Sequence, residues 1–206
     1  MRPDIVAGTT LPDYQLPDHT RTPRRLSELQ GSYNTMILML GRGAYCAKDR
    51  QQLHQLVELS AQCGVGYTRI VTVTCDEWVV SHGLRLGVGA HWPFLHDPGR
   101  LIRDDLDIAE YTAHGNPPMI PHTLVLAPGL RIHRIYNGYW YWGRPSLADL
   151  HRDLRELTEQ VRFDADLAAP GVRSAWERGE RGRFYPYASS FEDTIAEMGV
   201  SGVSRG

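Results

Sequence analysis

The segment between residues 35 and 75 constrains the fold most strongly. Residues 35–40 (TMILML) form a continuous apolar run, as expected of a strand that is buried on both faces of a sheet. Residues 47–63 then place apolar side chains at a helical period, and residues 67–75 (YTRIVTVTC) are β-branched and strand-like. A long helix between two strands joins them as parallel neighbours, so the sequence predicts an α/β fold.

Residues 122–136 have a different pattern, with two strand-like segments close together. The segments 122–127 and 130–136 are separated by Pro128 and Gly129. Proline followed by glycine is favoured at the two central positions of a type II turn. Because so tight a connection joins antiparallel strands, we predict a hairpin here and a mixed sheet overall.

Helices are expected to flank this sheet. Residues 77–86 follow Asp76, which is expected to cap their helix, and residues 100–112 also have a helical pattern. A last helix is predicted to begin near Ser146, because Asp149 stands where a capping box requires an acidic side chain. Short strands are expected near residues 14–16 and at residues 92–95.

The chain is long enough for one domain and an extension. Of its 206 residues, we assign 1–163 to the α/β domain and 164–206 to an irregular C-terminal extension. The extension is polar and glycine-rich, with too few aliphatic residues to fold alone. Its five aromatic residues are Trp176, Phe184, Tyr185, Tyr187 and Phe191. We expect them to pack over the domain or over a second subunit.

Composition and charge argue against several classes of protein. Apolar residues make up 42% of the chain, and the net charge of −2 comes from interspersed acids and bases. This balance argues against a nucleic-acid-binding surface and against a basic membrane patch. No segment has the ~18 apolar residues of a membrane-spanning helix, and the first residues lack the apolar core of a signal peptide. The expected location is a reducing cytoplasm.

Cysteine and histidine spacing predicts no metal. The three cysteines stand at positions 46, 63 and 75 and form no CxxC pair, so a disulfide framework or a zinc ribbon is not expected. The nine histidines show no ligand spacing such as HExxH. We therefore expect neither a metal nor an organic cofactor.

Cys46 is the candidate redox thiol. It lies in GRGAYCAKD, between a buried strand and a helix, where the helix N-terminus favours a thiolate. Arg42, Lys48 and Arg50 add positive charge nearby, so we expect a solvent-accessible, reactive thiol. The alternative is a small buried cysteine in a turn. The segment lacks the last glycine of a dinucleotide-binding motif and the G-K-[ST] of a phosphate-binding loop.

The other two cysteines differ in their relation to Cys46. Cys75 ends the second parallel strand, and neighbouring parallel strands finish at the same edge of a sheet. It is therefore the candidate resolving thiol, and the alternative is a small core residue. Cys63 lies far along the helix, about 25 Å from Cys46 at about 1.5 Å per residue, so it is expected to be a core residue.

Two further segments have open interpretations. Pro121 directly precedes a predicted strand, a position that proline tolerates. The aromatic segment NGYWYWGRP, residues 137–145, is interpreted as core, subunit contact or pocket wall, with core packing as the default.

These pieces resemble a known family. The order of LPDHTRTPRRLSEL, GRGAYCAKDRQQL, IVTVTCD, WPFLHDPGR and IPHTLVLAPGLRIHRIYNGYWYWGRPS is similar to that of peroxiredoxin-like proteins of the alkyl hydroperoxide reductase C/thiol-specific antioxidant family. The resemblance extends from Leu16 to about Leu157. It implies a thioredoxin-like mixed sheet flanked by helices, with Cys46 at the peroxidatic position and Pro121 at the active-site cis-proline position.

The chain departs from the family's pattern at several positions. Typical peroxiredoxins carry proline and threonine where this chain has Met39 and Gly43, and their active-site arginine falls near Pro121, where no arginine stands. Thioredoxins carry a second cysteine where this chain has Asp49. The chain thus resembles a sister branch that keeps one cysteine and neither full motif.

The sequence and the resemblance together predict a thiol-dependent oxidoreductase of peroxiredoxin type. The Cys46 thiolate would attack a peroxide and become a sulfenic acid, with Arg42 holding the thiolate and polarising the peroxide. An external small thiol or Cys75 would then resolve it. The expected partners are a peroxide and a thiol reductant, with no nucleic acid and no membrane, and a homodimer is an open alternative to a monomer. The competing hypotheses are a redox-inert or regulatory thioredoxin-fold binding module and, less directly, a cysteine hydrolase.

Overall fold

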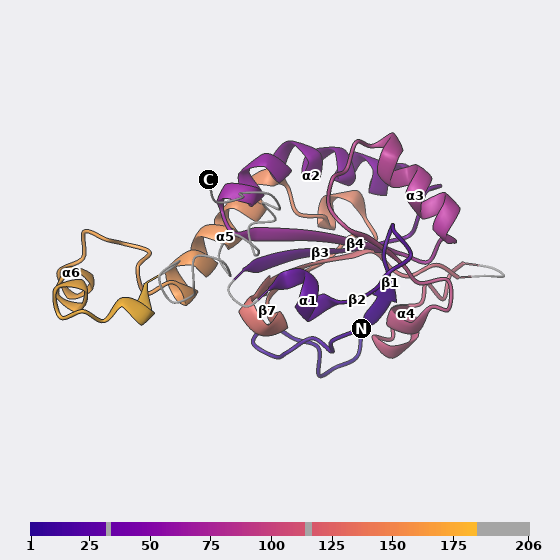
Figure 1. Ribbon diagram of the computed structural model, residues 1–206. Coiled ribbons are helices and arrows are strands. Elements are labelled where there is room, and N and C mark those ends of the chain that lie inside the picture. The colour runs from indigo at the N-terminus through magenta and orange to yellow at the C-terminus, as the bar shows by residue number, and fades with distance from the viewer. Residues whose placement is uncertain (32–33, 114–116, 185–206) are drawn as a thin grey trace. The chain divides into compact units, whose positions relative to one another are not determined.

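The computed structural model describes residues 1–31, 34–113 and 117–184 (Figure 1). Contacts divide the chain into two compact units, residues 1–153 and the residues from 154 onward. The division falls inside the helix α5 (Leu147–Val161). The domain boundary expected after residue 163 stays a prediction, because contact density alone does not define a folding unit.

Unit 1 is built around a five-stranded mixed sheet in the order β5-β4-β3-β6-β7. The central strand β3 (Thr35–Gly41) pairs in parallel with β4 (Thr68–Thr74), which pairs in parallel with β5 (Phe94–His96). On its other side β3 pairs antiparallel with β6 (His122–Ala127), and β6 forms a hairpin with β7 (Arg131–Asn137). The predicted α/β class, the parallel pair and the antiparallel hairpin are therefore confirmed.

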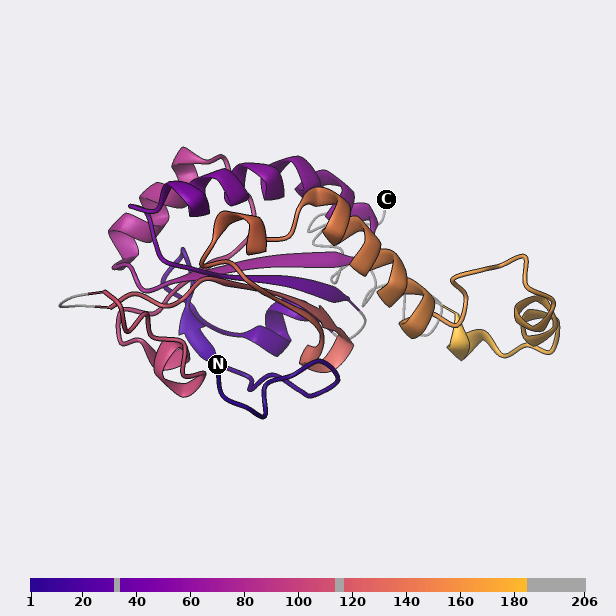
Figure 2. The same cartoon turned by 180° about the vertical axis from the view of Figure 1, so that it is seen from behind.

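Helices cover both faces of this sheet (Figures 1 and 2). The long helix α2 (Ala47–Val65) and α3 (Trp78–Gly87) lie on one face, and the short helices α1 (Leu26–Gln30) and α4 (Leu101–Asp105) lie on the other. The remaining elements of this unit are the antiparallel ribbon of β1 (Gln15–Pro17) and β2 (Pro23–Arg25) and the 3-10 turns η1 (Pro128–Leu130) and η2 (Tyr141–Gly143).

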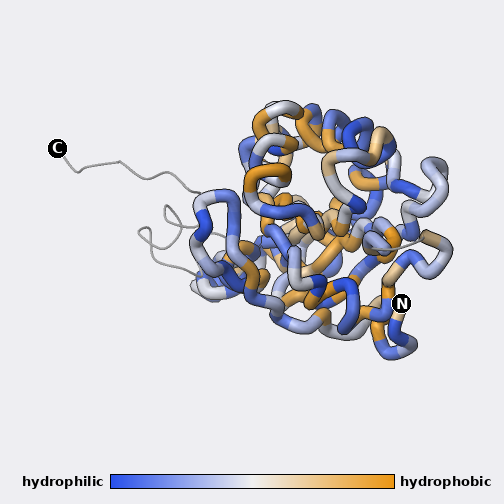
Figure 3. The backbone as a smooth tube through the Cα atoms, turned by 90° about the vertical axis from the view of Figure 1, so that its right-hand side faces the viewer, coloured by the Kyte–Doolittle hydropathy of each residue, from blue (hydrophilic) through white to orange (hydrophobic). Residues whose placement is uncertain are grey.

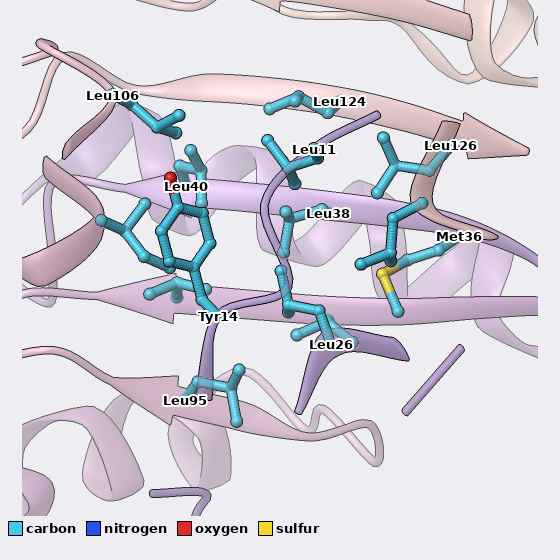
Figure 4. Packing of buried hydrophobic residues seen from close by; sticks show 14 of the residues in the cluster. Leu11, Tyr14, Leu26, Met36, Leu38, Leu40, Leu95, Leu106, Leu124 and Leu126 are labelled. Carbon is cyan, nitrogen blue, oxygen red and sulfur yellow. The ribbon is translucent and has the colours of Figure 1, made fainter. Parts of the chain in front are cut away.

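The main apolar core lies on the face of α1 and α4 (Figure 4). Strand β3 contributes Met36, Leu38 and Leu40, because alternate side chains of a strand point to the same face. The intervening positions of β3 face α2, where the Met39 side chain lies beside Gly41 and the carboxylate of Asp49. Figure 3 shows the hydrophobic residues concentrated along the strands in the middle of this unit.

Local sequence signals account for the start of α5 and for the turn between β6 and β7. At the start of α5, Ser146 N donates to Asp149 Oδ2 (3.0 Å) and Asp149 N donates to Ser146 Oγ (3.1 Å), so the predicted capping box is confirmed. In the β6–β7 hairpin, Gly129 adopts φ 74°, the left-handed conformation that a type II turn requires of its second central residue. The Gln30 side chain closes that turn by donating to Ala127 O and accepting from Leu130 N.

Two predictions about helices are wrong. The helix expected over residues 100–112 ends at Asp105, because Asp107 takes up φ 51° and the chain then extends to a bridge between Ala109 and Met119. Asp76 does not cap α3, whose N-cap is Glu77. The Asp76 carboxylate instead accepts a hydrogen bond from the backbone before Cys46.

Unit 2 contains one helix that the sequence did not predict, α6 (Pro170–Glu177), and the 3-10 turn η3 (Arg181–Arg183). Its small apolar cluster is formed by Val172, Ala175 and Phe184. Phe184 also meets Trp176 edge-on, with ring centroids 5.1 Å apart. The other three aromatics of the extension, Tyr185, Tyr187 and Phe191, lie outside the described residues.

Candidate functional site

Cys46 is the N-cap residue of α2. Its backbone is extended (φ −85°, ψ 111°), its N–H donates to Gly43 O, and its carbonyl accepts the first helical hydrogen bond from Arg50 N, both at 3.1 Å. The thiol therefore stands at the positive end of a helix of 19 residues, where unpaired N–H groups favour an anion.

The expected solvent accessibility of Cys46 is not observed. The residue is only 6% exposed, whereas Tyr45 beside it is 65% exposed. The turn before the helix folds the cysteine inward and the tyrosine outward. A small reagent is thus better suited than a bulky one to reach this sulfur.

Two carboxylates hold the loop before Cys46 (the Cys46 loop, residues 42–45). Gly43 N donates to Asp49 Oδ2 (3.1 Å), and Ala44 N donates to Asp76 Oδ2 (2.8 Å). Burial raises the pKa of Asp76, and the nearby Asp49 charge adds to this effect, while the bond from Ala44 opposes it. Gly43 has φ 117°, and a Cβ atom there would lie 2.6 Å from the Asp76 carboxylate oxygens. The loop therefore requires glycine at this position.

A buried arginine that sequence analysis missed supports the same loop. Arg144 Nη2 donates to Asp49 Oδ1 at 2.6 Å, Nη1 donates to Gln52 Oε1 at 2.7 Å, and Nε donates to Gly138 O at 3.1 Å. The side chains of this ion pair are 3% and 1% exposed. Arg144 thus balances the charge of Asp49 and ties the first turns of α2 to the segment after β7. The pair is far apart in the chain, so no local spacing could have revealed it.

Arg42, the predicted thiolate partner, is engaged elsewhere as well. Its Nη2 lies 2.7 Å from Glu110 Oε2, and its guanidinium lies 5.6 Å from the centre of the Tyr45 ring. Burial lowers the pKa of Arg42, but the negative charges of Tyr45, Glu110 and Cys46 outweigh it and raise that pKa. Arg42 is therefore within electrostatic reach of Cys46 while it is anchored to Glu110.

A pocket of about 400 Å³ (the aromatic pocket) is linked by side-chain contacts to the Cys46 loop and to the first turn of α2. It is lined by Glu110, Tyr111, Thr112, Ile120, Asn137, Tyr139, Trp140 and Gly143. The Arg42–Glu110 ion pair joins the loop to one wall. Lys48 in the first turn of α2 joins the other wall, since its Nζ donates to Tyr139 O (3.0 Å) and lies 5.5 Å from the Trp140 ring centre. Of the interpretations of residues 137–145, a pocket wall fits Tyr139 and Trp140 better than core packing does.

Cys75 stands on the other face of the sheet. It packs against the cluster of α1 and α4, on the face of Val71 and Val73, whereas Cys46 begins the helix of the opposite face. Burial raises the pKa of the Cys75 thiol to about 11. This environment favours the core-residue alternative over the resolving thiol.

Cys63 and Pro121 occupy the expected places in the chain. Cys63 is buried within α2, and burial raises the pKa of its thiol to about 12. Pro121 directly precedes β6, and its carbonyl accepts from Gly138 N (2.7 Å), whose own carbonyl accepts from Arg144. Pro121 is thus connected through Arg144 to the residues that hold the Cys46 loop. The cis isomer of the Ile120–Pro121 bond stays a prediction.

No helix among the described residues is both long and apolar enough to cross a membrane.

Solved structures provide the comparison. The chain is similar to the peroxidoxin BcpB of Mycobacterium tuberculosis, with a TM-score of 0.63 at 19% identity over 74% of this chain and 96% of that one. It is similar to AhpC of Enterococcus faecalis, with a TM-score of 0.63 at 16% identity over 80% and 98%. It is also similar to a PrxQ mutant of Xylella fastidiosa, with a TM-score of 0.60 at 15% identity over 75% and 96%.

Sequence comparisons add nothing to this likeness. No family model matches the chain, and no curated protein matches it. The structural neighbours show that the chain has a peroxiredoxin-like thioredoxin fold, as the resemblance in sequence predicted.

Proposed function

We propose that this protein, which has a peroxiredoxin-like fold, is a thiol-dependent peroxidase that reduces peroxides at Cys46. The observation that carries the proposal is the position of this thiol at the start of α2, on a loop fixed by Asp49 and Asp76. Such a helix N-terminus with a nearby guanidinium stabilises a thiolate, which is the reactive form.

The first step is the attack of the Cys46 thiolate on one oxygen of the peroxide. An S–O bond forms and the O–O bond breaks, which oxidises the sulfur to a sulfenic acid. The second oxygen leaves as an alcohol, or as water when the substrate is hydrogen peroxide, and takes up a proton. Arg42, a cation within electrostatic reach of Cys46, is the residue proposed to stabilise the charge in this step.

The second step needs a thiol from outside the chain. The chain has three cysteines; Cys63 is buried far along α2, and Cys75 packs against the core cluster on the other face of the sheet. An external thiol attacks the sulfenic acid sulfur, which releases water and forms a mixed disulfide. A second thiol then regenerates Cys46 and leaves as the oxidised disulfide. A reducing cytoplasm would supply such thiols, and a homodimer stays part of the proposal.

The experiment compares peroxide consumption by the wild-type protein and two variants in the presence of excess dithiothreitol. We expect Cys46→Ser to lose the activity to background and Cys75→Ser to keep it within about twofold, because only Cys46 stands at a charged helix N-terminus. A Cys46→Ser variant that still consumes peroxide would contradict the proposal.

The second candidate is a redox-inert binding module. The burial of Cys46 at 6% exposure and the engagement of Arg42 by Glu110 favour it. Alkylation by iodoacetamide between pH 5 and pH 9 separates the two candidates. A peroxidase should show alkylation of Cys46 already at neutral pH, whereas an inert module should show alkylation rising only near the ordinary thiol pKa of about 8.5.

A further inference from the structure

The aromatic pocket is larger than the peroxidase reaction of small peroxides requires. Its volume of about 400 Å³ lies in the range of sites that bind a complete small molecule. Hydrogen peroxide is close to a water molecule in size, and water occupies only about 30 Å³ in the liquid. The pocket, which Arg42 and Lys48 connect to the residues on either side of Cys46 in the chain, therefore has room for a larger reactant.

The positions of the cysteines indicate that the larger reactant is the reductant. Neither Cys63 nor Cys75 can reach the sulfur of Cys46, since one is far along α2 and the other is on the opposite face of the sheet. The reductant must come from outside. Because Cys46 is only 6% exposed, a slender small-molecule thiol reaches it more readily than a cysteine on the surface of another folded protein.

The walls of the pocket are suited to a molecule with an apolar body and an anionic group. Tyr111 and Trp140 are 88% and 73% exposed and present aromatic surface to a ligand. Lys48 uses one of its three N–H donors on Tyr139 O, and its ammonium stands beside the Trp140 ring. The cation over the rings disfavours a positively charged ligand and favours a carboxylate. The one acid of the lining, Glu110, is paired with Arg42.

We propose that the aromatic pocket binds the reductant, a low-molecular-weight thiol that carries a carboxylate and an apolar or peptide-sized body. The proposal rests on the proposed peroxidase function. In the bound state the sulfur of the ligand's thiol attacks the Cys46 sulfenic acid and the S–O bond breaks. The leaving hydroxide takes up the proton that the thiol gives up and departs as water, and the mixed disulfide forms. The mixed disulfide then holds the ligand's body against Tyr111 and Trp140.

The test separates the oxidation step from the reduction step by stopped-flow mixing. Reduced protein is mixed with hydrogen peroxide or with cumene hydroperoxide, and the sulfenic acid form is then mixed with glutathione or with 2-mercaptoethanol. The pocket variants are Trp140→Ala and Tyr111→Ala. Trp142→Ala is the matched control, because Trp142 is 91% exposed and is not part of the pocket lining.

We expect each pocket variant to need about fivefold more glutathione for the half-maximal rate of reduction, the effect of one lost aromatic contact. Oxidation by either peroxide and reduction by 2-mercaptoethanol should stay within about twofold of wild type, as should all rates of Trp142→Ala. Lys48→Met should reduce the advantage of glutathione over 2-mercaptoethanol.

Two results would overturn the inference. Slower oxidation by cumene hydroperoxide with unchanged reduction by glutathione would make the pocket a peroxide site, and unchanged rates throughout would show that it binds neither reactant. Failure of the proposed peroxidase function itself would look different, since no variant and no wild-type protein would then form a sulfenic acid at Cys46.

Discussion

Cys46 and Cys75 stand near the same edge of the sheet, but their surroundings differ in almost every respect. Cys46 begins α2 on a loop that Asp49 and Asp76 hold, within electrostatic reach of Arg42. Cys75 follows β4 and faces an apolar cluster, where burial raises the pKa of its thiol to about 11. The difference teaches that a shared sheet edge does not make a shared site: Cys75 continues the face of Val71 and Val73, whereas Cys46 begins the helix that covers the opposite face.

The hydrogen bonds and the ion pair that Asp49 makes with Gly43 and Arg144 distinguish the surroundings of Cys46 from those of Cys75. Asp49 is buried, so its charge is tolerable only because Arg144 pairs with it and Gly43 donates to it. The same carboxylate therefore links the stability of the fold to the geometry of the loop before the thiol. Cys75 packs against the core cluster, and the charged side chains that act on its thiol are those of Asp97, Arg100 and Arg103.

Of the substitutions considered, removal of Arg144 should have the largest effect on the stability of the fold. Arg144→Met leaves the buried Asp49 carboxylate without its cation, and breaking such a pair costs about 3–5 kcal/mol of unfolding free energy. Urea unfolding measures the change. The matched control is Arg173→Met, because Arg173 is 80% exposed and pairs with Glu177, which is itself 61% exposed, so its loss should leave the unfolding midpoint nearly unchanged.

The Arg144 variant should also slow the oxidation of Cys46, since Asp49 then holds the Cys46 loop less firmly. A loss below about 1 kcal/mol with normal oxidation kinetics would show that the Arg144–Asp49 ion pair supports neither the fold nor the site.

A substitution in the loop should have an intermediate effect. Gly43→Ala places a Cβ atom 2.6 Å from the Asp76 carboxylate at φ 117°, so we expect a destabilisation of about 1–3 kcal/mol and slower oxidation of Cys46. Gly99→Ala is the control, because a Cβ atom there meets nothing within 4 Å. Thermal unfolding and stopped-flow oxidation are the measurements. Equal behaviour of the two variants would mean that the loop conformation is not held by Asp76.

The smallest effect should come from the buried thiols of Cys63 and Cys75, which should lower the free energy of unfolding at alkaline pH. In the unfolded chain a thiol loses its proton near pH 8.5, whereas burial raises the pKa of Cys75 to about 11 and that of Cys63 to about 12 in the folded protein. The stabilisation is complete below about pH 8.5 and is lost as the pH rises through the folded-state values. The double variant Cys63→Ala/Cys75→Ala should lose less of its unfolding free energy between pH 8 and pH 10.5. An identical decline in both proteins would contradict the assignment of these thiols to apolar surroundings.

Local patterns predicted much of the fold. The apolar run of β3, the helical period of α2 and the Pro-Gly pair at the β6–β7 turn each correspond to an element that neighbouring residues largely determine. The same holds for the capping box of Ser146 and Asp149. The helix expected to reach residue 112 was wrong because the left-handed backbone of Asp107 ends it, and the bridge from Ala109 to Met119 replaces it.

The candidate site was predictable only in part, because its cysteine is local and its supporting groups are not. Cys46 follows from its place between a strand and a helix. Arg144 and Asp49 meet only after folding, and the available signal was an acidic residue in the first turn of α2 together with an arginine among the aromatics after β7. Asp76 was predicted to cap α3, because it directly precedes the residues expected to form that helix. Its contact with Ala44, before α2, forms only in the folded chain.

The central claim is that Cys46 alone among the three thiols reacts with peroxide. Its most direct test treats the reduced protein with one equivalent of hydrogen peroxide at pH 7, traps sulfenic acid with dimedone, alkylates the remaining thiols and maps all three cysteines by mass spectrometry. The account predicts the dimedone adduct on Cys46, with Cys63 and Cys75 recovered as free thiols after denaturation. Cys46 recovered as a free thiol while another cysteine carries the oxidation would contradict it.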